Sequence, residues 1–108
     1  MPVVFTATEA GYANGLGRAS NSKGLESYHY VQFGRSPDGK PGHQFEFDDV
    51  HYRSVNGVIK VAVARRVVEF DLKDQKVIIM REDLADVEWN RFLKGILEVF
   101  GDSIIELS

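Results

Sequence analysis

The residues best suited to chemistry in this chain of 108 residues gather in one short segment. The segment contains Glu46, Asp48 and Asp49, followed closely by Tyr52 and Arg53. Two neighbouring carboxylates can act as general acid and base, but only if an apolar pocket keeps one of them protonated. Here the neighbours are polar or charged, which favours exposed carboxylates. An aromatic ring, an arginine and complementary charge are what interface hot spots use, so we predict these five as partner-binding residues.

Other chemistry has less support in the sequence. His29, His43 and His51 are 14 and 8 residues apart, which is not the spacing of a metal site, and the chain has no cysteine. The glycine-rich run Gly11–Gly17 lacks the lysine and hydroxyl residue of a phosphate-binding loop. No serine stands in a Gly-x-Ser-x-Gly frame. We therefore expect no enzyme, no metal and no cofactor.

Charge and hydropathy limit the partners. The chain has 13 basic and 16 acidic residues and a net charge of −3, so it lacks the basic surplus of a nucleic-acid-binding protein. The longest apolar runs, such as Val61–Ala64 and Val77–Met80, are far shorter than the ~20 residues of a membrane span. The first residues do not resemble a signal peptide. We expect one cytoplasmic domain over residues 1–108, without nucleic-acid or membrane partners and with a homodimer as an open alternative.

The elements that must position these residues are mostly strands. Period-two alternation and β-branched residues predict an α+β fold with an antiparallel sheet of about five to seven short strands. The segments with strand character are Val3–Thr8, Ser27–Phe33, Gln44–Arg53, Val58–Ala64, Arg66–Leu72 and Val77–Arg81, with weaker signals at Leu16–Ala19 and Ile104-Ile105. Turns are expected at Asn14-Gly15, Asn56-Gly57 and Arg65-Arg66, and loops over most of Glu9–Gly24 and over Ser36–Gly42. The alternation slips at Asp48-Asp49, which indicates a bulge or a strand end.

The period changes near the C-terminus and predicts one amphipathic helix. Apolar residues recur at the helical spacing in the order Trp89, Phe92, Leu93, Ile96, Leu97 and Phe100. Asp86 is suited to the N-cap, and Gly101 to the C-cap. This stripe should pack on one face of the sheet, and Phe92 and Ile96 in particular should be buried.

The order of these features resembles the tenth family of bacterial immunity proteins, from polymorphic toxin systems. The segments that carry the resemblance are Tyr30-Val31-Gln32-Phe33-Gly34-Arg35, Glu46-Phe47-Asp48-Asp49, Arg53-Ser54, Gly57-Val58-Ile59, the hairpin Val61–Leu72 and the helix Trp89–Phe100 with Gly101. The resemblance covers roughly residues 28–101. The chain departs from the family pattern at Val50, where a glutamine is sometimes expected, and in the loop Ser36–Gly42.

The resemblance implies that the protein binds a cognate toxin and neutralises it by occlusion, without catalysis. Exposed carboxylates would speed association with a basic toxin. Two alternatives remain open. One is another small binding module, such as a secretion chaperone or a carbohydrate-binding domain. A carbohydrate-binding domain would need exposed rings among the Tyr residues and Trp89. The other is a small enzyme, which would need a cleft where Glu46, Asp48 or a histidine is desolvated and paired.

Overall fold

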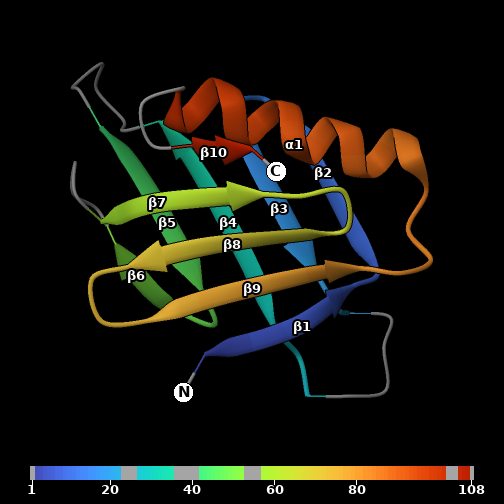
Figure 1. The fold of residues 1–108 in the computed structure, drawn as a ribbon, viewed down its shortest axis with the longest axis horizontal. Coiled ribbons are helices and arrows are strands. Elements are labelled where there is room, and N and C mark those ends of the chain that lie inside the picture. Colours follow the sequence, from blue (N-terminus) through green and yellow to red (C-terminus); the bar gives the residue numbers. More distant parts are fainter. Residues whose placement is uncertain (1, 23–26, 36–41, 53–56, 102–104, 108) are drawn as a thin grey trace.

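The computed structural model describes residues 2–22, 27–35, 42–52, 57–101 and 105–107, and for residues 51, 52 and 105–107 it describes the backbone alone. Within these residues ten strands form two sheets of five strands each, and there is one helix (Figure 1). In chain order the elements are β1 (Val3–Ala7), β2 (Glu9–Ala13), β3 (Leu16–Ser20), β4 (Tyr30–Arg35), β5 (His43–Phe47), β6 (Val50–Tyr52), β7 (Val58–Val63), β8 (Val67–Leu72), β9 (Lys76–Arg81), α1 (Asp86–Phe100) and β10 (Ile105–Leu107). Sheet A has the order β1-β9-β8-β7-β10, and sheet B has the order β2-β3-β4-β5-β6.

The predicted fold class is confirmed, because most strand pairs are antiparallel, including every pair of sheet B, and the C-terminal helix packs on sheet B. Two pairs are parallel: β1 with β9, and β10 with β7. The described strands are more numerous than the predicted five to seven, and they form two sheets. Relative to the segments named from the sequence, the additional strands come from β2 and from the division of one predicted strand into β5 and β6, while β10 corresponds to the weak signal at Ile104-Ile105.

Strand β2 corrects the sequence interpretation, which assigned most of Glu9–Gly24 to a loop. Glycine and alanine give β2 little intrinsic strand preference. The strand forms because it pairs with β3 along its whole length and because Tyr12 packs against Gly95 of α1. The expected turn at Asn14-Gly15 is confirmed, with φ of 54° and 78°, the positive values that a two-residue hairpin turn requires.

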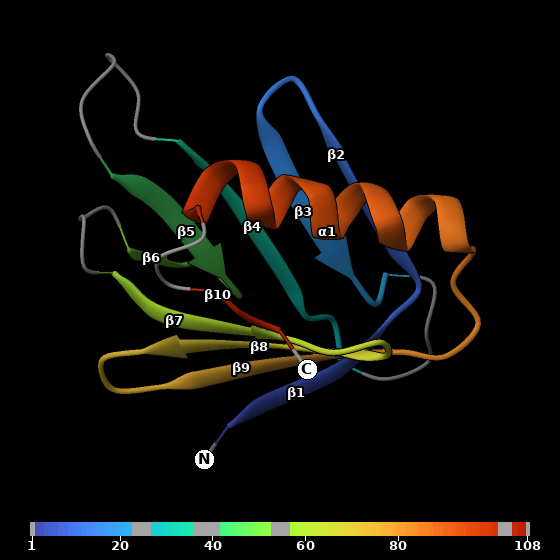
Figure 2. The same ribbon diagram turned by 45° about the horizontal axis from the view of Figure 1, so that its top comes forward.

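The core lies between the two sheets, whose strands cross at a large angle (Figure 2). Phe33 and Phe45 of sheet B contact Phe70 of sheet A, with ring centroids 5.9 and 4.8 Å apart. Phe33 also lies directly over Gly17, where an added Cβ would come within 2.2 Å of its ring. Only a residue without a side chain therefore fits at position 17.

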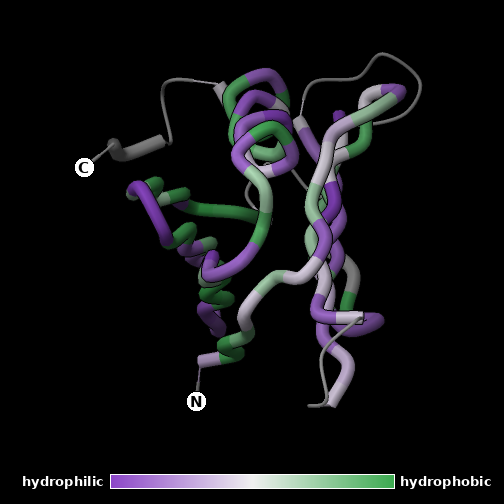
Figure 3. Tube along the Cα trace, turned by 90° about the vertical axis from the view of Figure 1, so that its right-hand side faces the viewer, coloured by the Kyte–Doolittle hydropathy of each residue, from purple (hydrophilic) through white to green (hydrophobic). Residues whose placement is uncertain are grey.

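Helix α1 closes one end of the space between the sheets (Figure 3). Trp89, Phe92, Ile96 and Phe100 are buried as predicted, whereas Leu97 is 44% exposed. The N-cap is Ala85 and not Asp86, which is the first helical residue and whose carboxylate accepts a hydrogen bond from the Arg81 guanidinium. Gly101 is the C-cap, as expected, and donates its N–H to the Leu97 carbonyl; its φ of 74° is positive, but its ψ of 174° is not that of the left-handed helical conformation that was expected.

Of the remaining predicted turns, Arg65-Arg66 is confirmed: the residues are exposed, and the Ala64 N–H bonds to the Val67 carbonyl at 2.8 Å across them. Asn56, Arg53 and residues 36–41 of the predicted loop lie outside the described residues. No helix in the described part of the chain is long and apolar enough to span a membrane.

Candidate functional site

We call the side of sheet B that faces sheet A and α1 its inner face, and the opposite side its outer face. Along β4, Val31 and Phe33 point to the inner face and are buried. Tyr30 and Gln32 alternate with them and therefore belong to the outer face. Residues directly opposite on paired strands share a face, so Arg18 and Glu46, which flank Gln32, belong to the outer face as well.

The structure brings three of the five predicted site residues together. Glu46 lies on β5, as expected, while Asp48 and Asp49 form the turn between β5 and β6 and lie beyond the end of the strand. Both turn residues have positive φ, of 46° and 69°. Tyr52 is paired with Phe45 in the ladder between β6 and β5, and Arg53 lies outside the described residues.

Tyr30 holds this acidic turn in place. Its hydroxyl donates to a carboxylate oxygen of Glu46, lies 3.1 Å from Asp49 Oδ1 and accepts the Asp49 N–H at 3.1 Å. Burial first, and then the hydrogen bond to Glu46, raise the pKa of Tyr30 well above its ordinary value. The phenol therefore keeps its proton and fixes both carboxylates at neutral pH.

Asp48 makes a second link, to the segment that precedes β4. Its Oδ2 lies 2.6 Å from Nδ1 of His29, and its Oδ1 accepts the Tyr30 N–H at 2.9 Å. The His29 ring also stacks on Phe5, with centroids 5.9 Å apart. The two side chains are 31% and 25% exposed, so this acid–histidine pair is half-buried.

The surface is completed by Arg18, Gln32 and Tyr28, which were not selected from the sequence. The Arg18 guanidinium donates to Gln32 Oε1 at 3.1 Å and to the Tyr28 hydroxyl at 2.6 Å, and lies 4.9 Å from the centre of the Tyr30 ring. Tyr28 stacks on Tyr30 at 5.7 Å and is 52% exposed. The alternation of Arg18 with buried neighbours on a predicted strand was the available signal, but a strand's face cannot be assigned before its partners are known.

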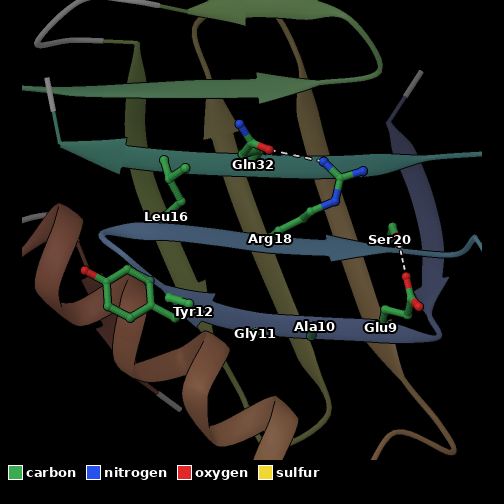
Figure 4. Close-up of a pocket in the computed structure, with 9 residues that line it drawn as sticks. Glu9, Ala10, Gly11, Tyr12, Leu16, Arg18, Ser20 and Gln32 are labelled. Carbon is green, nitrogen blue, oxygen red and sulfur yellow. Dashed lines mark hydrogen bonds between the residues drawn. The ribbon is translucent and has the colours of Figure 1, made fainter. Parts of the chain in front are cut away.

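A groove of about 380 Å³ runs along the outer face beside this cluster (Figure 4). Backbone and small side chains of β2 form its floor, and outer-face side chains of β3 and β4 line it. The hollow exists because Gly11 has no side chain: a Cβ there would meet no atom within 4 Å. Leu16, Arg18, Ser20 and Gln32 line it from β3 and β4, and Glu9 lines it from β2.

Comparison of the chain with protein-family models, with curated proteins and with solved structures found no match. The function must therefore be argued from this surface itself. In the described part of the chain, no three histidine, aspartate or glutamate side chains gather in a way that could hold a metal ion. What the surface offers is the exposed Tyr28 ring stacked on the buried Tyr30, the fixed Arg18 guanidinium that lines the groove, and three carboxylates at the acidic turn.

Proposed function

We propose that the protein is an immunity protein that binds a cognate bacterial toxin with the outer face of sheet B and blocks it by occlusion. The observation that supports this proposal is the gathering of Tyr28, Tyr30 and Arg18 beside Glu46 and Asp49 on one sheet face. Tyrosine and arginine dominate interface hot spots, and Tyr28 and Arg18 are exposed here while the buried Tyr30 supports them. The helix and sheet A pack on the other side of sheet B, and on the outer face Arg18, Tyr28 and Asp49 are exposed.

The preorganisation of the cluster favours binding. Ordering a side chain at an interface costs about 0.5–1.5 kcal/mol for each rotamer-rich residue. Arg18 is already held by two hydrogen bonds and a cation–π contact, and Glu46 is held by Tyr30. A partner therefore meets groups that lose little further entropy, which suits a protein whose target must be neutralised quickly.

The charges on this face favour a basic partner. Glu46, Asp48 and Asp49 lie at one end of the cluster, and the chain has a net charge of −3. Carboxylates that surround a docking surface raise the association rate of a cationic protein, most strongly at low salt. This is the arrangement expected for neutralising a toxin with a basic active site, such as a nuclease.

The test is coexpression with the toxin domain encoded beside this gene, followed by calorimetry of the purified pair. We expect protection from the toxin and submicromolar binding. Tyr28→Ala should weaken binding at least ~30-fold, as a hot-spot tyrosine does. Met80→Ala is the matched control, because Met80 is 43% exposed on β9 of sheet A and should leave binding unchanged.

Two results would contradict the proposal. Lack of both protection and binding would contradict the proposed immunity function. Binding that is lost in Met80→Ala and kept in Tyr28→Ala would show that the toxin does not dock on the outer face of sheet B.

A hydrolytic function is the second candidate, because His29 and Asp48 form the hydrogen-bonded pair that orients a general base. A structural role accounts for the same contacts, since Asp48 also accepts the Tyr30 N–H and His29 stacks on Phe5. His29→Gln distinguishes the two: an enzyme would lose its activity, whereas a binding protein would keep its partner. The carbohydrate alternative is weakened because Trp89 is only 1% exposed and cannot offer a stacking platform.

A further inference from the structure

Arg18 has an unusual environment for an exposed arginine. Among the residues that the structure describes, its guanidinium contacts only neutral groups, namely the Gln32 amide oxygen, the Tyr28 hydroxyl and the Tyr30 ring. Guanidinium has five N–H donors, and the two hydrogen bonds use two of them. The positive charge is therefore held in place by neutral groups, and no carboxylate among the described residues forms an ion pair with it.

The fixed guanidinium also lines the groove on the outer face. The rest of the groove is mainly apolar, with a floor at Gly11 and Ala13 and with Leu16, 43% exposed, at one side. Glu9 and Ser20 also line it, and the Ser20 hydroxyl donates to the Glu9 carboxylate. Its volume of about 380 Å³ is at the lower end of the range for ligand sites, so it suits one or two side chains and not a whole helix. An apolar hollow beside a fixed cation is complementary to an apolar group beside an anion.

We propose that this groove binds a short segment of the partner protein in which an aliphatic or aromatic side chain is followed by a carboxylate. The apolar side chain lies over Gly11 and Ala13 against Leu16, and the carboxylate takes the free donors of Arg18. Charge-assisted bonds to a planar guanidinium are directional, so Arg18 sets the register of the segment. The proposal rests on the proposed function, because it places the segment on the toxin.

The charges around the groove support a peptide of this kind over a uniformly basic one. Arg18 lies at one position of the outer face, and Glu46 lies two strands away, on the other side of Gln32. A partner surface that matches both must present an acid toward the groove and a base toward the acidic turn. Alternating charge of this type rejects partners in the wrong register.

A capped dipeptide tests the groove without any toxin. The probe is acetyl-Leu-Asp-amide, added to the ¹⁵N-labelled full chain and compared with acetyl-Leu-Asn-amide, which has the same shape and no charge. We expect the amide signals of Gly11 and Ala13 and the Nε–H signal of Arg18 to move, with the aspartyl peptide binding at least ~5-fold more tightly because its bonds are charge-assisted. Equal affinities for the two peptides would overturn the inference, as would no shift at ~20 mM peptide, well above a millimolar Kd.

Two variants and one control assign the effect to the groove. Arg18→Gln should abolish the preference for the aspartyl peptide, and Gly11→Val should block both peptides by filling a hollow that has room for a side chain. Arg91→Gln removes the same charge from an exposed position on α1 and should leave the preference unchanged. A preference that persists in Arg18→Gln would overturn the inference.

The toxin then separates this inference from the function on which it rests. If the toxin binds and its affinity is unchanged by both Arg18→Gln and Gly11→Val, the groove inference fails while the immunity function stands. If the dipeptide binds as expected and the neighbouring toxin does not bind, the groove is retained and the immunity function fails.

Discussion

The carboxylate of Asp48 joins the acidic turn to the start of β4, because its Oδ2 lies 2.6 Å from Nδ1 of His29. The other oxygen of the same carboxylate accepts the Tyr30 N–H, 18 residues away in sequence. Asp48 also has φ of 46°, a conformation that aspartate and asparagine tolerate better than most residues. One side chain therefore satisfies a backbone donor, orients a histidine and permits the turn.

Replacement of Asp48 should show two of these roles, the acceptor for the Tyr30 N–H and the turn. We expect Asp48→Ala to lower the free energy of unfolding by about 2–3 kcal/mol, since it removes the acceptor of the Tyr30 N–H and places a Cβ-bearing residue without a polar group at positive φ. Asp48→Asn keeps an acceptor and the turn preference, and should cost less than about 1 kcal/mol. Urea unfolding of the two variants measures the difference. Equal losses in both would show that the charge, and not the acceptor, is what matters.

Tyr30 should make the protein sensitive to alkali. Its pKa is raised in the folded state, so above the ordinary tyrosine pKa of about 10 the unfolded chain loses a proton that the folded chain keeps. Stability is therefore fully present below that pH and falls as the pH rises further. Tyr30→Phe should flatten this fall, at a cost of about 1–2 kcal/mol at neutral pH because Glu46 loses its donor.

Urea unfolding at a series of pH values between about 8 and 11.5 checks the alkaline effect. Tyr12 is the internal comparison, because burial and Glu98 also raise its pKa and leave a residual slope in the variant. A Tyr30→Phe variant with the same slope as the wild type would contradict the assignment to Tyr30.

His43 should produce the opposite dependence on the acidic side. It is 5% exposed, its Nε2 accepts the Val58 N–H, and burial lowers its pKa. Below the ordinary histidine pKa of about 6.5 the unfolded chain binds a proton that the folded chain resists, so stability falls as the pH drops. His43→Gln can keep an acceptor for Val58 and cannot titrate, so it should be less sensitive between about pH 7.5 and 5. An unchanged slope would place the acid sensitivity elsewhere.

Gly17 and Gly11 form a matched pair for testing the packing of sheet B. A Cβ at Gly17 would meet the Phe33 ring at 2.2 Å, whereas a Cβ at Gly11 has open space. We expect Gly17→Ala to cost about 2–4 kcal/mol through displacement of a core ring. Gly11→Ala should be neutral or slightly stabilising, because it restricts the unfolded chain. Thermal unfolding of both variants measures the contrast, and similar melting temperatures would contradict it.

The sequence predicts well those elements whose signals are local. The helix from Asp86 to Phe100 follows from the spacing of Trp89, Phe92 and Ile96, and the hairpin turn follows from Asn14-Gly15. The wrong N-cap has a physical reason: Asp86 is bonded to Arg81, a contact that depends on tertiary placement. Strand β2 was missed for the same reason, since its partners, not its composition, make it a strand.

The candidate site likewise contains residues that local sequence indicates and residues that only the tertiary structure brings together. Glu46, Asp48 and Asp49 could be selected because they are neighbours in sequence, and the structure brings them together around Tyr30. Arg18 could not be selected, because its meeting with Tyr28 depends on the register of β3 against β4. Register between strands is fixed by the whole inner face, which a short window of sequence does not contain.

The two sheets differ in how far along the chain their partners lie. Sheet B joins strands that follow one another in the chain, from Glu9 to Tyr52. In sheet A, β1 pairs with β9, which places Val3 opposite Val77, most of the chain later. Contacts between neighbours close small loops and form early, while distant contacts carry a larger entropic cost and slow the search for the native state. During synthesis the surface that we assign to recognition can thus assemble from segments already outside the ribosome, and the N-terminal strand must wait for its partner.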